Sequence, residues 1–571
     1  MLFSLIILFI YFTMFVENIN FMQKVSYSFL MFFALLFSDA TIAQDVERPK
    51  LVVGVMVDQM RWDYLYRYYD RYGENGFKRL LRQGFSMENT YIDYLPTYTA
   101  VGHTSVYTGS VPAIHGIAGN DFVIQSNGKH IYCTEDNEVE GVGTTAKAGQ
   151  MSPKNLLTST VGDELRLATN FQSKIIGIAL KDRASILPGG RFANAAYWLD
   201  GDSGDFITSS FYMNDLPKWV KKFNRQNLAK KYLSQNWKTL YDINTYMQSI
   251  EDNNPYEEKY KGADAPVFEV DMKKMMKESG VGTISSVTFG NDFTLDFAKA
   301  AIEEESLGNN PAGVPDFLAL SLSSPDYIGH RFGPTAIEIE DTYLRLDTEL
   351  ANFMAYLDET VGEGEYLLFL TADHGAAHNP QFMKDKGAHA GYFNTAEAHK
   401  KINEVLEKEF GHTDIARSSI NYQVHLDYDL IEKENLDIEA IKTLIIRELL
   451  KMDKVAFAVD QTKAITSSVP QPIRDRIVNG YNSKRSGEIQ YVLEPQHYGG
   501  REGSTGTTHG TWGPYDSHIP LIFMGWGVAS GESHRTVHMT DIASTIAAFL
   551  KIQEPNGNIG KPILEVLESK K

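Results

Sequence analysis

The sequence contains very little cysteine: Cys133 is the single one among its 571 residues. A lone thiol excludes an internal disulfide and any zinc site built from several thiolates. Basic residues are also outnumbered, with 54 Lys and Arg against 73 Asp and Glu, which gives a formal net charge of −19. Nucleic-acid binders need basic surfaces to neutralise phosphates, so we expect no nucleic acid as a dedicated partner. Bound dications would still allow such a chain to handle phosphate groups.

Long hydrophobic runs are missing as well. The two apolar segments, residues 2–16 and 27–37, are both shorter than the roughly 20 residues of a membrane-spanning helix. The second segment has a short basic start and ends in small residues, which is typical of a signal peptide cleaved after Ala43. We therefore interpret residues 1–43 as an export signal, with Met22 as an alternative start and a double membrane anchor as the competing interpretation. The mature protein is expected to be periplasmic or secreted, without a stable membrane span.

Buried strands alternate with helices along the rest of the chain. Near-continuous hydrophobic runs, typical of strands covered on both faces, occur at residues 50–57, 174–180, 316–322, 366–371 and 519–525. Helical patterns occur at residues 75–83, 154–170, 292–305, 337–357, 395–410 and 438–452. This alternation predicts an α/β fold with a doubly wound, mostly parallel sheet flanked by helices.

The predicted catalytic domain covers residues 48–571 and contains two inserted cap segments. The first insertion covers about residues 197–290, where we predict no buried strand because Lys, Asn and aromatic residues interrupt the hydrophobic pattern. The second covers about residues 378–500 and contains Lys/Glu-rich helices and polar loops. No low-complexity linker separates independent domains.

Acidic and histidine residues follow the predicted strands or lie in the loop before the last one, at the edge where open α/β sheets bind ligands. These residues are Asp58, Asp326, His330, Asp373, His374 and His509. A single strand-end aspartate is more often a helix cap or turn residue. Asp326 and His330, however, are four positions apart and would share one face of a helical turn. Carboxylates and imidazoles without thiolates favour catalytic zinc, while manganese or iron also fit these ligand types.

A threonine-rich turn lies between these residues in the sequence. Pro96 permits a sharp turn, and the small residues after it are suited to the start of a helix. A hydroxyl in the first helical turn would meet free N–H groups and the positive dipole end, which favour a phosphoryl anion. Residue chemistry alone leaves Thr97, Thr99 and Thr104 as alternatives, and an N-cap threonine is the competing structural interpretation.

Three further polar residues, Asn120, Lys181 and Arg183, bear on the class of substrate. The Asn120 amide is suited to donate to a phosphoryl oxygen, with a turn asparagine as the alternative. Lys181 and Arg183 are two positions apart after a predicted strand, so on an extended segment their side chains would point the same way. Two cations suit the dianionic group of a phosphate monoester. A solvated basic strand end is the alternative interpretation.

Four short segments resemble the alkaline phosphatase superfamily: residues 57–61, 96–103, 371–375 and 540–548. More narrowly, they resemble the exported, phosphate-irrepressible bacterial alkaline phosphatases, near the nucleotide pyrophosphatase/phosphodiesterase branch. The similarity runs from about residue 48 to the C-terminus. It implies a broad-specificity phosphomonoesterase, an alkaline phosphatase that acts on small-molecule phosphate monoesters through a phosphothreonine intermediate at Thr99.

The same resemblance implies two zinc ions. The first is expected to be held by Asp326, His330 and His509. The second is expected to be held by Asp58, Asp373, His374 and Thr99. In the resembling phosphatases an Asn and a Lys-x-Arg bind the monoester oxygens, which implies this role for Asn120, Lys181 and Arg183.

Two other functions compete with this interpretation. A phosphodiesterase or nucleotide pyrophosphatase on the same fold is the first alternative, although that branch lacks the Lys-x-Arg pair. A non-catalytic binding protein that keeps the fold is the second. A dedicated sulfatase is excluded, because no Cys or Ser lies in a C/S-x-P-x-R context. We expect a monomer, and the sequence indicates no third metal.

Overall fold

The computed structural model describes residues 7, 11, 14–16 and 46–569. The chain divides into two units, Met1–Glu47 and Arg48–Lys571. Most of the predicted export signal, residues 1–43, lies outside the described residues, so this prediction remains untested. Within the described part of the chain, no helix combines the length and the apolar character that a membrane crossing requires.

A mixed sheet of eleven strands forms the centre of the second unit. Its middle strand, β1 (Leu51–Val57), is buried along its whole length. It pairs in parallel with β9 (Asp316–Leu322) on one side and β10 (Tyr366–Thr371) on the other. Beyond β9, β6 (Ile175–Ile178) continues the parallel order. These strands lie within the predicted hydrophobic runs, because a strand covered on both faces has to be apolar on both.

The sheet becomes antiparallel toward both edges. β18 (Leu521–Gly525) runs antiparallel to β10 and to β2 (Phe85–Tyr91). At the other edge, β7 (Ala195–Asp200) pairs in parallel with β6 and antiparallel with β8 (Asp205–Ser209). Our prediction that the first insertion contains no buried strand was therefore wrong.

The two strands that we did not predict, β7 and β8, are buried by contacts with α11 (Phe289–Glu304), a helix distant in sequence. The ring of Phe206, in β8, stacks on Phe297 with centroids 3.9 Å apart. Tyr197, in β7, meets the same ring edge-on at 5.3 Å. Such aromatic pairs bury large apolar areas, although the local sequence alternates too irregularly to indicate a strand.

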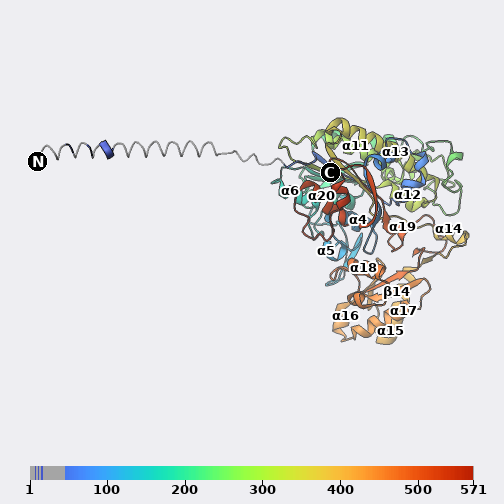
Figure 1. Cartoon of the computed structure of the whole chain (residues 1–571). Coiled ribbons are helices and arrows are strands. Elements are labelled where there is room, and N and C mark those ends of the chain that lie inside the picture. The colour runs from blue at the N-terminus through green and yellow to red at the C-terminus, as the bar shows by residue number, and fades with distance from the viewer. Residues whose placement is uncertain (1–6, 8–10, 12–13, 17–45, 570–571) are drawn as a thin grey trace. The chain divides into compact units, whose positions relative to one another are not determined.

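Helices cover the sheet in two groups (Figure 1). One group consists of α3 (Phe77–Gln83), α11 (Phe289–Glu304), α12 (Ser324–Phe332) and α13 (Ile337–Leu357). The other consists of α4 (Thr99–Thr108), α6 (Val161–Ala168), α7 (Asp182–Gly189) and α20 (Asp541–Leu550). This arrangement confirms the predicted α/β fold. The bounds of α13 equal the predicted 337–357, because its apolar stripe faces the core along its whole length.

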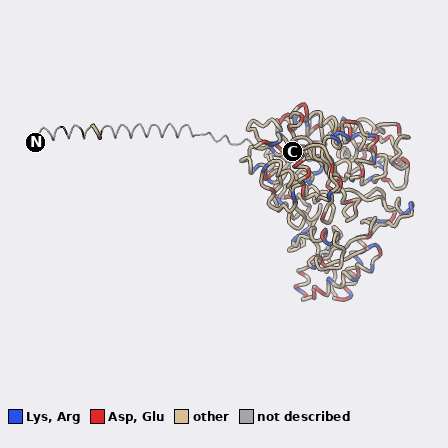
Figure 2. Tube along the Cα trace, viewed as in Figure 1, with Lys and Arg blue, Asp and Glu red and all other residues tan. Residues whose placement is uncertain are grey.

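The second insertion contains a separately packed cap, seen around α15, α16 (Tyr428–Lys433) and α17 in Figure 1. Its four-stranded sheet has the order β12 (Ala416–Ser418), β13 (Gln423–Leu426), β15 (Ile489–Leu493) and β14 (Val455–Asp460). The helices α15 (Thr395–Phe410) and α17 (Ile438–Leu449) pack on it around their own hydrophobic core. Basic and acidic residues are mixed along this cap (Figure 2), as expected for a solvated surface.

Candidate active site

Three aspartates meet at the carboxyl ends of the central strands. Asp58 directly follows β1, and its backbone N–H donates to the carbonyl of Leu322 at the end of β9 (3.1 Å). Asp373 follows β10, and Asp326 lies in the first turn of α12 after β9. All three are buried. The parallel register of the three strands brings these carboxylates to one edge, as predicted from the sequence.

Three histidines at this edge are each held by a backbone carbonyl. The Nδ1 atoms of His330, His374 and His509 lie 2.9, 3.0 and 2.7 Å from the carbonyls of Thr507, Gly375 and Thr97. An imidazole that donates Nδ1–H to a carbonyl presents the lone pair of Nε2 to a metal. The rings of His374 and His509 stack with centroids 3.5 Å apart. The site therefore contains three oriented imidazoles.

The ligand atoms form two groups whose members lie within 4.8 Å of one another. One group consists of Asp58, Asp373 and His374. The other consists of Asp326, His374 and His509. His374 thus belongs to both, and His330 Nε2 lies 3.2 Å from Asp326 Oδ1 at the side of the second group. The structure brings all six predicted ligands together, and their division between two ions remains a prediction.

The donor set fits cations. Among the described residues, the buried oxygens Asp58 Oδ1 and Asp373 Oδ2 have no hydrogen-bond partner. Burial and the Asp373 carboxylate raise the pKa of Asp58 well above its ordinary value. Burial and the neighbouring His374 and His330 lower the pKa of His509, which keeps that ring neutral. Buried carboxylate oxygens without a hydrogen-bond partner and neutral imidazoles are the groups that divalent metal ions bind.

Lys181 lies between the two groups of ligands. Its Nζ donates to Asp58 Oδ2 at 2.7 Å and to Asp326 Oδ2 at 2.5 Å. Burial lowers the pKa of Lys181, but the Asp326 and Asp58 carboxylates outweigh this effect and raise it above its ordinary value. A buried ammonium that contacts two carboxylates offsets part of their charge and stays protonated.

Thr99 is the first residue of α4 and is buried. Its Oγ1 lies 3.4 Å from His374 Nε2. The other two candidate hydroxyls bond to backbone groups: Thr97 Oγ1 donates to the Thr511 carbonyl, and Thr104 Oγ1 to the Ala100 carbonyl. Of the three threonines that the residue chemistry left open, Thr99 is therefore the one whose hydroxyl lies beside His374, a predicted metal ligand.

Asn120 contacts this helix start, and Arg183 lies on a cavity wall together with Lys181. The backbone N–H of Ala100, in the first turn of α4, donates to Asn120 Oδ1 at 2.9 Å, which leaves the Asn120 Nδ2 group as a donor. Arg183 Nη1 donates to the Tyr132 hydroxyl at 3.1 Å. Lys181 and Arg183 both line a cavity of 370 Å³, together with Tyr327.

The backbone around Lys181 differs from our expectation. We predicted an extended segment on which Lys181 and Arg183 point the same way, but the strand ends at Ile178 and α7 begins at Asp182. Lys181 is the N-cap of this helix and Arg183 lies in its first turn, so the period of two does not apply. The two side chains share one cavity wall because of the strand-to-helix turn.

Sequence reasoning assigned no role to two residues that organise the site, Gln59 and His103. Gln59 donates from its backbone to Asp373 Oδ1 at 3.1 Å and from Nε2 to Asp326 Oδ1 at 2.6 Å. His103 Nδ1 lies 2.9 Å from the Thr99 carbonyl and 3.3 Å from Asp373 Oδ2. His103 follows Thr99 by four positions, so the two residues share one face of a helix. This spacing was the feature of the sequence that could have indicated a role for His103. Gln59 gave no signal, because its partners are distant in sequence.

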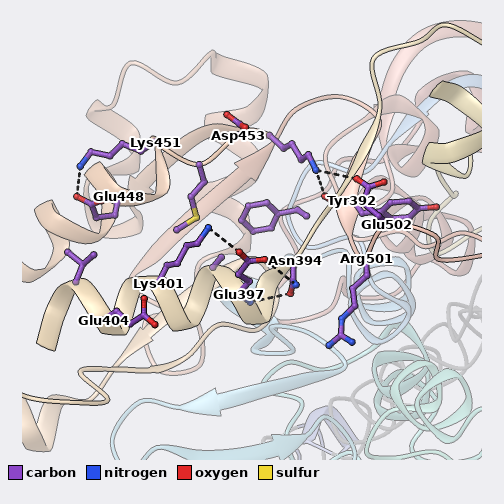
Figure 3. Close-up of a pocket in the computed structure, with 16 residues that line it drawn as sticks. Tyr392, Asn394, Glu397, Lys401, Glu404, Glu448, Lys451, Asp453, Arg501 and Glu502 are labelled. Carbon is purple, nitrogen blue, oxygen red and sulfur yellow. Dashed lines mark hydrogen bonds and ion pairs between the residues drawn. The ribbon is translucent and has the colours of Figure 1, made fainter. Parts of the chain in front are cut away.

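The cap contains a separate cavity of 720 Å³ between α15 and the end of α17 (Figure 3). None of the predicted site residues line it. Several charges on its wall are paired with each other, such as Lys401 with Glu397 at 3.1 Å and Lys451 with Glu448 at 2.7 Å. The chemistry predicted from the sequence is therefore located at the sheet edge and not in this cavity.

Comparison with known proteins identifies a family. Residues 52–514 match the family described as type I phosphodiesterase/nucleotide pyrophosphatase. A protein of Myroides odoratus named calcium-transporting ATPase is 60% identical over 93% of this chain and 97% of the relative. Alkaline phosphatase PafA of Elizabethkingia meningoseptica is 49% identical over 91% of this chain and 95% of the relative.

Solved structures agree with the sequence comparison. The crystal structure of wild-type alkaline phosphatase PafA is 48% identical, with a TM-score of 0.89, and the match covers 92% of this chain and all of that one. A second structure, at a TM-score of 0.88, is a PafA variant with one threonine, one asparagine, one lysine and one arginine substituted.

Proposed function

The chain belongs to the family of type I phosphodiesterases and nucleotide pyrophosphatases, and we propose that it is an alkaline phosphatase that hydrolyses phosphate monoesters. The observation that carries this proposal is the position of Thr99. Its hydroxyl lies at a helix start, 3.4 Å from His374 Nε2, beside three buried carboxylates and three oriented imidazoles. A nucleophile next to a dication site is the arrangement that phosphoryl transfer requires.

We propose two zinc ions as the cofactors. Asp326, His330 and His509 would hold one, and Asp58, Asp373 and His374 the other, with the Thr99 hydroxyl beside it. When bound, such a pair supplies Lewis acidity that lowers the pKa of a hydroxyl and neutralises a leaving oxygen. This assignment is supported by the histidine rings that bond to backbone carbonyls and by the two buried carboxylate oxygens without a hydrogen-bond partner, Asp58 Oδ1 and Asp373 Oδ2.

Thr99 takes part in both half-reactions, the transfer of the phosphoryl group to its hydroxyl and the hydrolysis that follows. Thr99 Oγ, having lost its proton, bonds to phosphorus while the bond to the ester oxygen breaks, and the alcohol leaves with a proton. The N-terminus of α4, with the positive end of the helix dipole, would stabilise the resulting phosphoryl anion. Water then attacks phosphorus, the bond to Thr99 Oγ breaks, and the hydroxyl regains a proton while phosphate is released.

We assign the binding of the non-bridging oxygens to Asn120, Lys181 and Arg183. Asn120 Nδ2 is an available donor, and Arg183 supplies a planar set of N–H groups. Lys181 contacts Asp58 and Asp326, so it would share its charge between these ligands and the phosphoryl group. The same three residue types, together with a threonine, are those substituted in the solved PafA variant.

Substitution of Thr99 tests the proposal. Thr99→Ala should lower kcat for an aryl phosphate by at least about a thousandfold, since it removes the attacking group. Acid-quenched wild-type protein should contain a phosphorylated peptide that includes residue 99, and the variant should not. Mass spectrometry of the quenched peptides detects this difference directly.

Thr104→Ala is the matched control. It removes a buried hydroxyl from the same helix, one that bonds to the carbonyl of Ala100 at 2.6 Å. This variant should retain the phosphorylated peptide and most of the turnover. If Thr99→Ala kept wild-type turnover, the assignment of the nucleophile would be wrong.

We also propose that the protein is exported as a monomer to the periplasm or the medium, after loss of residues 1–43. The support is the short basic start and the small residues before the predicted cleavage site at Ala43. Sequencing the N-terminus of the mature protein tests this, and a mature chain that retains the apolar segments would contradict it.

A further inference from the structure

A third group of metal-ligating side chains lies at the base of the cap, outside the proposed active site. It consists of His389, Glu494 and His497, whose ligand atoms lie within 4.8 Å of one another. The chain enters the cap through β11 (Gly391–Phe393) and leaves it through β16 (His497–Gly499). These two strands pair in parallel. The three side chains are therefore located where the cap joins the rest of the chain.

The ring of His497 is oriented like those of the active-site histidines. Its Nδ1 lies 2.9 Å from the carbonyl of Pro495. His330, His374 and His509 show the same contact with a carbonyl, which leaves Nε2 with a lone pair for a metal. Among the described residues, His497 makes a side-chain hydrogen bond through Nδ1 and none through Nε2. The orientation is that of a metal ligand.

The other two residues lie beside the ring of His497. His389 Nε2 lies 2.6 Å from Glu494 Oε2, and the rings of His389 and His497 are 4.8 Å apart and tilted by 53°. Without a metal, His389 and Glu494 would form an exposed ion pair that leaves His497 without a partner. With a metal bound, all three side chains would serve as its ligands. Two imidazoles, one carboxylate and no thiolate form a ligand set suited to zinc, with one position left for water.

The backbone provides the space and the rigidity for such a site. Gly391 pairs with His497, and a side-chain carbon at position 391 would lie 2.9 Å from His497 Nε2. The absence of a side chain therefore keeps space open beside this nitrogen. The backbone N–H of Glu494 donates to the Lys454 carbonyl at 2.9 Å, and that of His497 to the Glu494 carbonyl at 3.1 Å. The backbone at two of the three ligands, Glu494 and His497, is therefore held in place before any ion binds.

The positive charge of the nearby Lys454 is already engaged by other groups. Lys454, which lines the cap cavity, donates from Nζ to the Tyr392 carbonyl at 2.8 Å and lies 3.6 Å from Glu502. Its charge is thus directed toward that cavity, where an acceptor and a carboxylate engage it. The remaining charge at the three ligands is that of Glu494, which favours a cation.

We propose that His389, Glu494 and His497 bind a zinc ion that joins the entry strand of the cap to its exit strand. The ion would link the segments before β11 and before β16, and so restrain the cap relative to the loop that continues to His509. Metal binding at a site formed in the folded state stabilises that state. This site is independent of the proposed hydrolysis.

Zinc stoichiometry of the full-length protein tests this proposal. Chelator-treated wild type and His389→Ala are titrated with Zn²⁺ alone, and bound metal is measured by calorimetry and by elemental analysis. The variant should bind one zinc fewer per chain and should lose part of the zinc-induced rise in Tm. Turnover of an aryl phosphate should be unchanged, because His389 is outside the catalytic machinery.

Two further variants control for unrelated effects. His534→Ala removes a histidine of similar side-chain exposure, 73% against 76%, that lies 3.8 Å from Glu532. It should bind as much zinc as wild type. Glu494→Gln keeps a hydrogen-bond acceptor for His389 but removes the charged ligand, and it should also bind one zinc fewer. Equal stoichiometry in wild type and His389→Ala would overturn the proposal, whatever number of ions the active site binds.

Discussion

At the scale of single residues, the site depends on side chains that are held by two groups at once. Gln59 donates to both Asp326 and Asp373, and His103 contacts both the Thr99 carbonyl and Asp373. These contacts orient carboxylates and the nucleophile before any substrate or metal binds. Pre-organisation of this kind reduces the reorganisation that the reaction requires.

Arg183 offers the clearest test of substrate class at this scale. Although burial lowers the pKa of Arg183, Tyr132 and Tyr327 raise it well above its ordinary value, so the side chain remains cationic. A charged hydrogen bond to a dianion is worth about 1.5–3 kcal/mol. Arg183→Ala should therefore lower kcat/KM for a monoester by roughly 10-fold to 150-fold, while a diester, with one charge fewer, should lose much less.

The comparison of the two substrates decides between the proposed function and its alternative. Lys174→Ala is the matched control, since it removes a half-buried cation that is paired with Glu305 at 3.3 Å. It should leave both activities near wild type. An equal loss on monoester and diester in Arg183→Ala would favour the phosphodiesterase or nucleotide pyrophosphatase interpretation.

At the scale of elements, the position of Thr99 depends on how closely α4 approaches the end of β10. Gly102 makes this approach possible, because a side-chain carbon at position 102 would lie 2.4 Å from the Asp373 carbonyl oxygen and 2.6 Å from its Cβ. The helix that carries the proposed nucleophile and the strand end that carries the proposed metal ligand Asp373 are thus in direct backbone contact.

We expect Gly102→Ala to destabilise the protein by about 1–3 kcal/mol, the usual effect of overpacking, and to lower kcat by moving Thr99 away from Asp373. Thermal unfolding and aryl phosphate turnover measure the two effects. Gly189→Ala, in α7, is the control, since its new carbon would lie 3.4 Å from Ala193 in ordinary contact. A Gly102→Ala protein with wild-type Tm and kcat would show that the two elements can separate without cost.

At the scale of the whole molecule, buried carboxyl groups away from the site set part of the pH dependence of stability. Burial raises the pKa of Glu257 from 4.5 to about 8. Its neighbour Glu338 is also buried, and among the described residues neither of the two Glu338 carboxylate oxygens has a hydrogen-bond partner. The two carboxyl groups therefore resist ionisation in the folded protein.

The sign of the effect follows from proton binding. Between the unfolded pKa of 4.5 and the folded pKa of about 8, the folded protein keeps a proton that the unfolded chain has lost. Unfolding releases this proton, so the free energy of unfolding should fall as pH rises through this window, by at most about 1.4 kcal/mol per pH unit. Glu257→Gln should remove this slope, as measured by urea unfolding at several pH values.

Glu258→Gln is the adjacent control, because that carboxylate is about half exposed and paired with Arg331 at 2.9 Å. Its stability should vary with pH as in wild type. A Glu257→Gln protein with an unchanged slope would show that Glu257 ionises at its ordinary pKa.

Several elements could be predicted from the sequence because their burial pattern is local. The helices at 337–357 and 395–410 have the predicted bounds, and β1, β9 and β10 lie within the predicted runs. β7 and β8 could not be predicted, because their burial depends on α11. The helical start at Asp182 was missed for a related reason: Lys181 is held by Asp58 and Asp326, which are distant in sequence.

The local sequence was enough to predict the class of fold and six candidate metal ligands, because the carboxyl ends of parallel strands meet at one edge of a sheet. Family resemblance selected Thr99 among three threonines. Only the tertiary structure decided which histidine nitrogens are free and how Gln59 and His103 hold the site. The same applies to the third histidine group at the base of the cap. These features depend on contacts between segments that are far apart in the chain, and no local pattern encodes such contacts.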